Sequence, residues 1–209
     1  AIVNGGVITL AQDIVLTENT TLVFGAAANS TTRAAAPVVT VLDLAGHTLS
    51  CVSTKTGTNF NMIDVKGGHL TIKDGAIVYE HKGANMEWNN STNIFDVTAG
   101  GVLNIKNINA INFGGSDMGF VAHLNNWGEV TLNVENSTLE SNYVAVRVFN
   151  SGYDMNNVTI KNSTLKGKYC FWVHNYKAAG DSVGTDATLK LDIYNGEQKS
   201  KDSFRIVLH

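Results

Sequence analysis

Apolar and polar residues alternate along this chain in short phrases that recur with drift. The phrases are LTIKDGAI from Leu70, LNIKNINAI from Leu103, LNVENSTL from Leu132, VTIKNSTL from Val158 and LKLDIYNG from Leu189. Their central apolar residues, Ile72, Ile105, Val134, Ile160 and Leu191, recur every 26 to 33 residues. Alternation predicts β-strands, and a recurrence of this length indicates stacked units that cannot bury an apolar face alone. No stretch shows the sustained 3.6-residue period of a helix.

A second alternating stretch precedes each of these phrases and ends in a turn that contains Gly or Asn. These stretches are VLDLAG (41–46), MIDVKGG (62–68), IFDVTAGG (94–101), VAHLNNWG (121–128), AVRVFNSG (145–152) and FWVHNY (171–176). Because neighbours on a strand point to opposite sides, alternate residues should face inward. The residues expected inside are Leu42, Leu44, Ile63, Val65, Phe95, Val97, Ala122, Leu124, Val146, Val148, Phe171 and Val173.

Together these patterns predict an all-β fold, a single-stranded right-handed parallel β-helix of about six to seven coils with an N-terminal cap. Residues 1–37 should form the cap and first coil, and residues 38–209 the repeats, as one continuous domain. Asn107, Asn136 and Asn162 share one repeat position, directly after a strand, and predict a ladder of turns. Leucine-rich repeats and a β-sandwich are the structural alternatives.

The composition narrows the function classes only a little. The chain has 209 residues, of which 44% are hydrophobic and 16% charged, with a net charge of −3. Basic residues are scattered and form no stripe, so we expect no nucleic-acid partner. No run of about 18 apolar residues occurs, so we expect no membrane insertion. Cys51 and Cys170 belong to distant repeats, so we expect two free thiols rather than a disulfide.

Several phrases resemble those of a known superfold. GHTLSCV, GGHLTIKDG, AGGVLNIKN and VTIKNSTLKG resemble the recurring phrases of right-handed β-helix proteins of the pectin-lyase-like superfold. They are similar above all to adhesin-like proteins that gut bacteria secrete or anchor at their surface. The resemblance covers roughly residues 38–195 and implies an extracellular or cell-surface location. The superfold hosts lyases, hydrolases, phage tailspikes and adhesins, so it does not select a function.

One outward-facing column carries the candidate chemistry. In chain order it reads Asp43, Asp64, Asp96, His123, Arg147 and Trp172. Stacked at about 4.8 Å, these residues would form a ladder on one face. Such a ladder could bind an acidic or neutral glycan, although an exposed polar ladder is also the ordinary surface of a β-helix. No cofactor is expected, except that Ca2+ could lie between the repelling carboxylates.

The same column supplies the catalytic candidates, Asp64, Asp96, His123 and Arg147. His123 or Arg147 could remove a proton alpha to a uronate carboxylate, and two carboxylates could serve glycoside hydrolysis. However, the paired-Asp, Gly-His-Gly and Arg-Ile-Lys signatures of β-helix polygalacturonases are absent. The neighbouring outward column, with Met62 and Ile94, is apolar and predicts either a covering loop, such as 83–93, or a partner surface.

Three functional hypotheses follow. The first is a non-catalytic secreted or cell-surface module, adhesin-like, that binds glycans or host and matrix proteins. The alternative is a small polysaccharide lyase or glycoside hydrolase acting on an acidic polysaccharide. The third is head-to-tail self-association, in which the last strand pairs with the first coil of a second copy.

Overall fold

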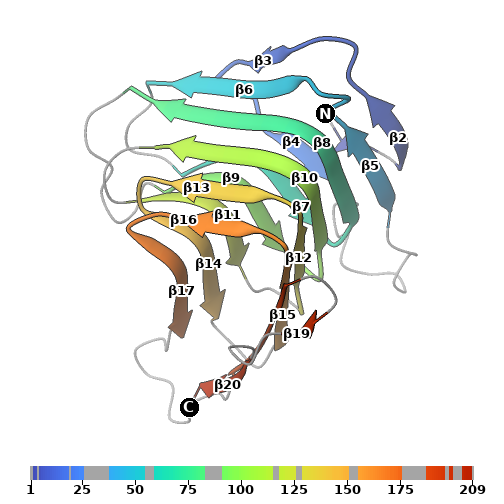
Figure 1. The fold of residues 1–209 in the computed structure, drawn as a ribbon. Helices are drawn as coiled ribbons and strands as arrows, with labels where there is room; N and C mark the ends of the chain where they lie inside the picture. Colours follow the sequence, from blue (N-terminus) through green and yellow to red (C-terminus); the bar gives the residue numbers. More distant parts are fainter. Residues whose placement is uncertain are drawn as a thin grey trace, which may run out of the picture.

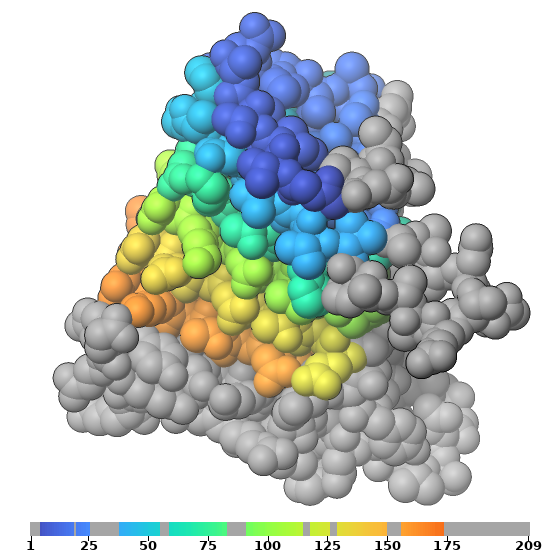
Figure 2. Space-filling view, turned by 90° about the vertical axis from the view of Figure 1, so that its right-hand side faces the viewer, coloured from blue at the N-terminus to red at the C-terminus, as the bar shows by residue number. Residues whose placement is uncertain are grey.

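The chain forms a stack of parallel strands. The structure is a computed structural model, and it describes residues 2–3, 5–18, 20–25, 38–54, 59–82, 91–114, 118–125, 129–150, 155–175, 187–195, 198–199 and 204–208. These residues are all-β and build a parallel β-solenoid of about four turns. Successive turns lie below one another from the N-terminal strands to β17 (Figures 1 and 2). The six to seven coils and the N-terminal cap expected from the repeats are not confirmed.

One wall of the solenoid is a seven-stranded sheet in the order β1-β4-β7-β9-β11-β14-β17. Its strands are all parallel, because each comes from the same part of a successive repeat. Their bounds are Ile2–Val3 (β1), Leu22–Phe24 (β4), Phe60–Lys66 (β7), Thr92–Thr98 (β9), Gly119–Asn125 (β11), Val144–Asn150 (β14) and Tyr169–Asn175 (β17).

The remaining walls belong to a thirteen-stranded sheet with two arms. The first arm contains Gly6–Thr9 (β2), Val39–Asp43 (β5), His69–His81 (β8), Val102–Phe113 (β10), Thr131–Glu135 (β12), Met155–Lys161 (β15) and Ala187–Asn195 (β18). The second contains Ile14–Leu16 (β3), Thr48–Ser53 (β6), Thr138–Ser141 (β13) and Thr164–Lys166 (β16), and β8 and β10 run through both. Antiparallel strands β19 (Gln198–Lys199) and β20 (Phe204–Leu208) pair with β18. No helix in the described part of the chain is long and apolar enough to cross a membrane.

The bend between the two arms contains the turn ladder that the sequence predicts. Asn107, Asn136 and Asn162 have φ of 52°, 49° and 48°, and Asp74 precedes them with φ of 60°. Asn and Asp tolerate this left-handed backbone better than other side chains that carry a Cβ. The Asn107 side chain also donates a hydrogen bond to the Asp74 carboxylate at 2.7 Å. The bend is therefore a repeated local conformation, fixed by residue type and by contacts between turns.

The core consists of aliphatic residues stacked from turn to turn. Leu70, Leu103 and Leu132 are aligned in register on successive strands and are completely buried. The residues expected inside are also buried, apart from Phe171 and Val173, which are partly buried and pack against the same cluster. Phe60 and Tyr79 stack inside the solenoid with ring centroids 5.5 Å apart. The residues that alternation predicts to face inward are therefore buried or partly buried in the described repeats.

The first repeat is aligned differently from the expectation. VLDLAG was expected to precede a turn in the same wall as Ile63, but Leu42 pairs with Ile72 of β8, in the thirteen-stranded sheet. The seven-stranded sheet instead receives β4, where Val23 pairs with Asp64. The reason is that residues 39–43 are the counterpart of HLTIK (69–73) and not of the strand that contains Ile63. The bend that follows is also longer, with residues 44–47 where the next repeat has only 74 and 75. The predicted division at residue 37 stays a prediction.

Candidate functional site

Five of the six predicted site residues lie in one column of the seven-stranded sheet. The pairs Asp64–Asp96, Asp96–His123, His123–Arg147 and Arg147–Trp172 are aligned in register on neighbouring strands. We call Asp64, Asp96, His123, Arg147 and Trp172 the outer column. It lies on the outside of the solenoid, because Ile63 and Val65 point into the core while exposed Lys66 shares the side of Asp64. The register predicted from the repeats is confirmed for these residues.

Asp43, the sixth candidate, is not part of this column. It lies on β5 in the thirteen-stranded sheet, opposite Lys73, with which it forms an ion pair. The backbone N–H of Ala45 also donates to its carboxylate at 2.9 Å. The hydrogen bond from Lys73 is the main reason that the pKa of Asp43 is lowered. The prediction that Asp43 belongs to this column was therefore wrong, because its strand pairs with β8 and not with β7.

The outer column is covered rather than open to solvent. Asp64, Asp96 and Arg147 are each 6% exposed and His123 is 7% exposed. The apolar residues beside them are completely buried, namely Met62, Ile94, Val121 and Ala145. Of the two interpretations of the apolar column, burial favours a cover within the chain. Most of the loop suggested for that cover, 83–90, lies outside the described residues.

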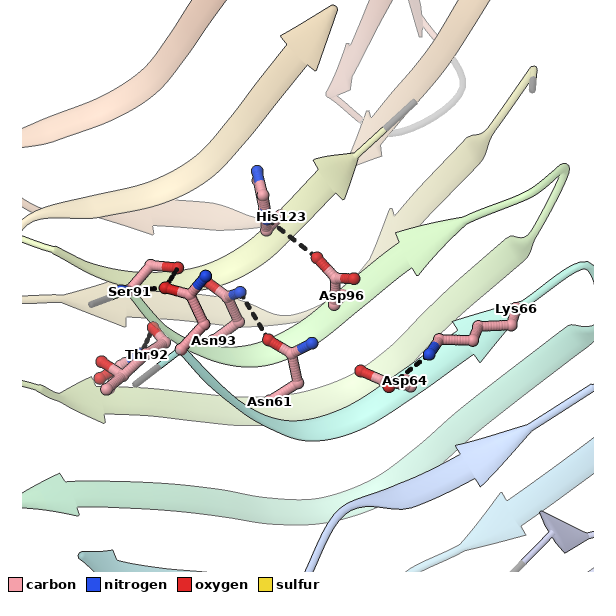
Figure 3. Close-up of polar contacts among 10 residues, drawn as sticks. Asn61, Asp64, Lys66, Ser91, Thr92, Asn93, Asp96 and His123 are labelled. Atoms are coloured by element: carbon pink, nitrogen blue, oxygen red, sulfur yellow. Dashed lines mark hydrogen bonds and ion pairs between the residues drawn. The ribbon is translucent and has the colours of Figure 1, made fainter. Parts of the chain in front are cut away.

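The acidic half of the outer column is divided into separate polar pairs (Figure 3). Nδ1 of His123 lies 2.9 Å from Oδ1 of Asp96, and Nζ of Lys66 lies 3.3 Å from Oδ2 of Asp64. The side chain of Asn93 donates to Asn61 at 2.7 Å, just beside Asp64. Each carboxylate thus has its own partner. Among the described residues, no group of three or more acidic, His or Cys side chains could hold a metal ion, and the Ca2+ hypothesis gains no support.

Burial shifts the pKa values of two residues of the outer column, Asp64 and Arg147. Loss of hydration raises the pKa of Asp64, against the opposing effects of the hydrogen bond from Asn61 and the charge of Lys66. Loss of hydration lowers the pKa of Arg147. Within the described residues, the buried atoms Oδ1 of Asp64, Nε2 of His123 and Nε of Arg147 have no hydrogen-bond partner. The column therefore holds polar groups at a cost in stability.

Arg147 is surrounded by aromatic rings instead of carboxylates. Its Cζ lies 4.9 Å from the ring centroid of Phe120, 5.1 Å from that of Phe149 and 5.3 Å from that of Trp172. Cation–π contacts with three rings compensate in part for the lost hydration. His123 also stacks on Phe120, with ring centroids 5.7 Å apart. The basic half of the column is thus an aromatic environment.

This aromatic environment continues to a cavity at the end of the column. The cavity measures about 260 Å³ and is lined by Tyr143, Tyr169, Phe171 and Trp172, which we call the aromatic corner. The ring of Tyr143 is perpendicular to those of Tyr169 and Trp172, at 86° and 87°, with centroids 5.7 and 5.8 Å away. Tyr169 is 49% exposed. The corner therefore joins rings in perpendicular orientations, one of which is half exposed to solvent.

The position of the corner follows from the repeat. Val144 and Tyr169 are in register at the start of β14 and β17, where the chain enters the seven-stranded sheet. Met118, Phe120 and Val144 form a second apolar cluster, distinct from the core, against which Tyr143 and Trp172 pack. The corner thus rests on buried apolar residues and not on a loop alone.

Reasoning from the sequence found Trp172 but missed Tyr143, Tyr169 and Phe171. A signal was present, because SNYVAVRVF and GKYCFWVHNY concentrate aromatic residues in the last two strands of this wall. Phe171 was predicted to face the core, and Tyr143 and Tyr169 fall just before the predicted strands. The cavity depends on contacts between aromatic residues of neighbouring turns of the solenoid, which the alternation does not describe.

Comparisons with protein-family models, with curated proteins and with solved structures find no match to this chain.

Proposed function

We propose that this protein is a non-catalytic, adhesin-like module, secreted or at the cell surface, that binds glycans at the aromatic corner. The observation that carries the proposal is the cavity of about 260 Å³ lined by Tyr143, Tyr169, Phe171 and Trp172. Sugar rings have apolar C–H faces that pack on aromatic rings, while tyrosine hydroxyls can bond to sugar hydroxyls. The resemblance of the repeats to adhesin-like proteins of the pectin-lyase-like superfold supports the same assignment.

The size and exposure of the corner fit a glycan chain better than an enclosed metabolite. Small-molecule sites usually enclose roughly 300–1,000 Å³ and bury most of the ligand. This cavity is smaller, and Tyr169 at its rim remains half exposed. A single sugar ring of a longer polymer would fit this arrangement, with the rest of the chain in solvent.

The outer column does not favour the alternative function as a lyase or hydrolase. Its catalytic candidates Asp64, Asp96, His123 and Arg147 are 6–7% exposed, so a polysaccharide would have to displace their cover to reach them. Asp96 is bonded to His123 rather than directed at a cleft. The alternative is tested by incubating acidic and neutral polysaccharides with the protein and measuring product size, with and without Ca2+.

The binding proposal is tested with Tyr169→Ala, because Tyr169 contributes the most exposed ring. Isothermal titration against a panel of soluble polysaccharides should show binding by the unchanged chain, and at least roughly tenfold weaker binding by the variant, as expected when a contact of about 1.4 kcal/mol is lost. Phe113→Ala is the matched control, because Phe113 is 44% exposed on β10 in the other sheet. Equal weakening in both variants, or an unaffected Tyr169→Ala, would contradict binding at the corner.

A further inference from the structure

Two cationic side chains lie against the aromatic corner. Nζ of Lys168 is 5.6 Å from the ring centroid of Tyr143 and 5.8 Å from that of Tyr169. The guanidinium of Arg147 lies 5.3 Å from the ring centroid of Trp172. Three of the four rings that line the cavity therefore have a positive charge beside them.

Among the described residues, no carboxylate compensates these charges. The described ion pairs of the neighbouring strands involve other cations, such as Lys166 with Glu140 at 3.3 Å and Lys106 with Glu135 at 3.6 Å. The four described side chains that line the cavity are aromatic, and none of these four is acidic. Arg147 is 94% buried, and its Nε has no hydrogen-bond partner within the described part of the chain. The corner therefore combines apolar ring surface with uncompensated positive charge.

Lys168 is free to change partners, whereas Arg147 is not. Lys168 is exposed, and an exposed cation–π contact is weaker than a charge-assisted hydrogen bond between an ammonium and an anion. An anion at the corner would therefore draw the ammonium from the rings. Arg147 is held among the rings of Phe120, Phe149 and Trp172. It would therefore act on a bound anion through its electrostatic field and by positioning the Trp172 ring.

We propose that the aromatic corner selects sugars that carry a carboxylate or a sulfate, and that the ammonium of Lys168 contacts the anionic group. This inference rests on the proposed glycan binding and names the class of glycan. Sulfate and carboxylate share the chemistry that the corner recognises, namely a negative charge with several acceptor oxygens beside an apolar sugar ring. A neutral sugar would bind by ring stacking alone.

The test uses two matched pairs of polymers, each with and without the charge. Dextran sulfate is compared with dextran, and polygalacturonate with its fully methyl-esterified form, by titration at low and high ionic strength. We expect roughly tenfold or tighter binding of a charged member than of its neutral partner, with the preference reduced by salt. The pair that shows the preference identifies the source of the anion.

Lys168→Gln should greatly reduce this preference, measured as the ratio of the affinities for the charged and the neutral member of each pair. Lys166→Gln is the control, because it removes a nearby positive charge that already has Glu140 as its partner. Equal loss in both variants would show diffuse charge attraction and overturn the inference. Equal binding of charged and neutral polymers would overturn it too, while leaving glycan binding intact. Failure of every polymer to bind would instead remove the proposed function itself.

Discussion

The outer faces of the two sheets follow the same alternation of residues, but their charged side chains differ in exposure to solvent. On the thirteen-stranded sheet, outward charges form partly exposed pairs, such as Lys106 with Glu135 and Lys166 with Glu140. On the seven-stranded sheet, the outward residues Asp64, Asp96, His123 and Arg147 are almost completely buried. Alternation determines which side of a strand a residue occupies. Whether the side chain is hydrated depends on whether other parts of the protein cover that side. The same residue types therefore cost little on one face and much on the other.

The largest expected difference between the faces is in apolar packing. Ile94, two residues before Asp96, is completely buried, whereas Val7 of β2 is 70% exposed. Ile94→Ala should lower the free energy of unfolding by about 2–5 kcal/mol, because it leaves a cavity. Val7→Ala should change it by no more than about 0.5 kcal/mol. Urea denaturation of both variants checks this, and similar midpoints would show that the seven-stranded sheet is not covered in solution.

The next largest difference should appear when one partner of a polar pair is removed. Asp96→Ala leaves His123 buried without its hydrogen bond and should cost about 3 kcal/mol in unfolding free energy. Glu135→Ala removes the partner of half-exposed Lys106 and should cost less than about 1 kcal/mol. The measurement is again chemical denaturation, and a larger loss from Glu135→Ala would reverse the comparison.

A smaller effect on stability is expected for substitutions at the bend between the two arms than for those on either face. Asn136 has φ of 49° where the two arms of the thirteen-stranded sheet meet. Asn136→Ala should be about 1 kcal/mol less stable than Asn136→Gly, because alanine is disfavoured in this conformation and glycine is not. Thermal unfolding of the pair isolates the backbone contribution, since both variants lack the side-chain amide. Equal melting temperatures would mean that the turn changes conformation.

The subtlest comparison is in pH dependence. Burial raises the pKa of Asp64, so its charge becomes a cost as the pH rises through the folded-state pKa. Asp64→Asn should therefore raise the melting temperature at neutral pH and change it little in acid. The pKa of Asp43 is lowered by Lys73, so its contribution is present at neutral pH and lost as the pH falls.

Asp43→Asn should consequently lower the melting temperature at neutral pH, with the difference fading in acid. Differential scanning calorimetry across this range would measure both variants under identical conditions. A parallel response of the two variants would show that the two carboxylates have equivalent surroundings, contrary to their positions in the two sheets.

The inner face and the register could be predicted because both depend on the period of the chain. Ile72, Ile105 and Val134 align since each repeat has the same strand positions, and the same reasoning aligned Asp64 with Arg147 through the intervening strands. The prediction for Asp43 was wrong since its strand is the counterpart of residues 69–73 and not of the strand that contains Asp64. Both strands of a repeat alternate in the same way, so alternation alone does not distinguish them.

Burial of the outer column could not be predicted, because it depends on contacts outside the repeat. Alternation predicts that Arg147 is exposed, yet Phe120, Phe149 and Trp172 surround its guanidinium. Tyr143, just before β14, and Tyr169, at the start of β17, likewise come from neighbouring turns of the solenoid and meet at the cavity. Such features depend on side chains from separate turns of the chain, and their prediction requires the fold.

Because the strands pair in parallel and in register, the distance along the solenoid axis is set by the number of repeats. Each strand of the seven-stranded sheet lies one strand spacing, about 4.8 Å, beyond the previous one. Insertion or loss of a whole repeat would therefore shift the aromatic corner along the axis by that increment and leave its own contacts unchanged. A single inserted residue within a strand would instead exchange the inner and outer sides from that point onward. Length can thus vary in whole repeats while the binding corner stays the same.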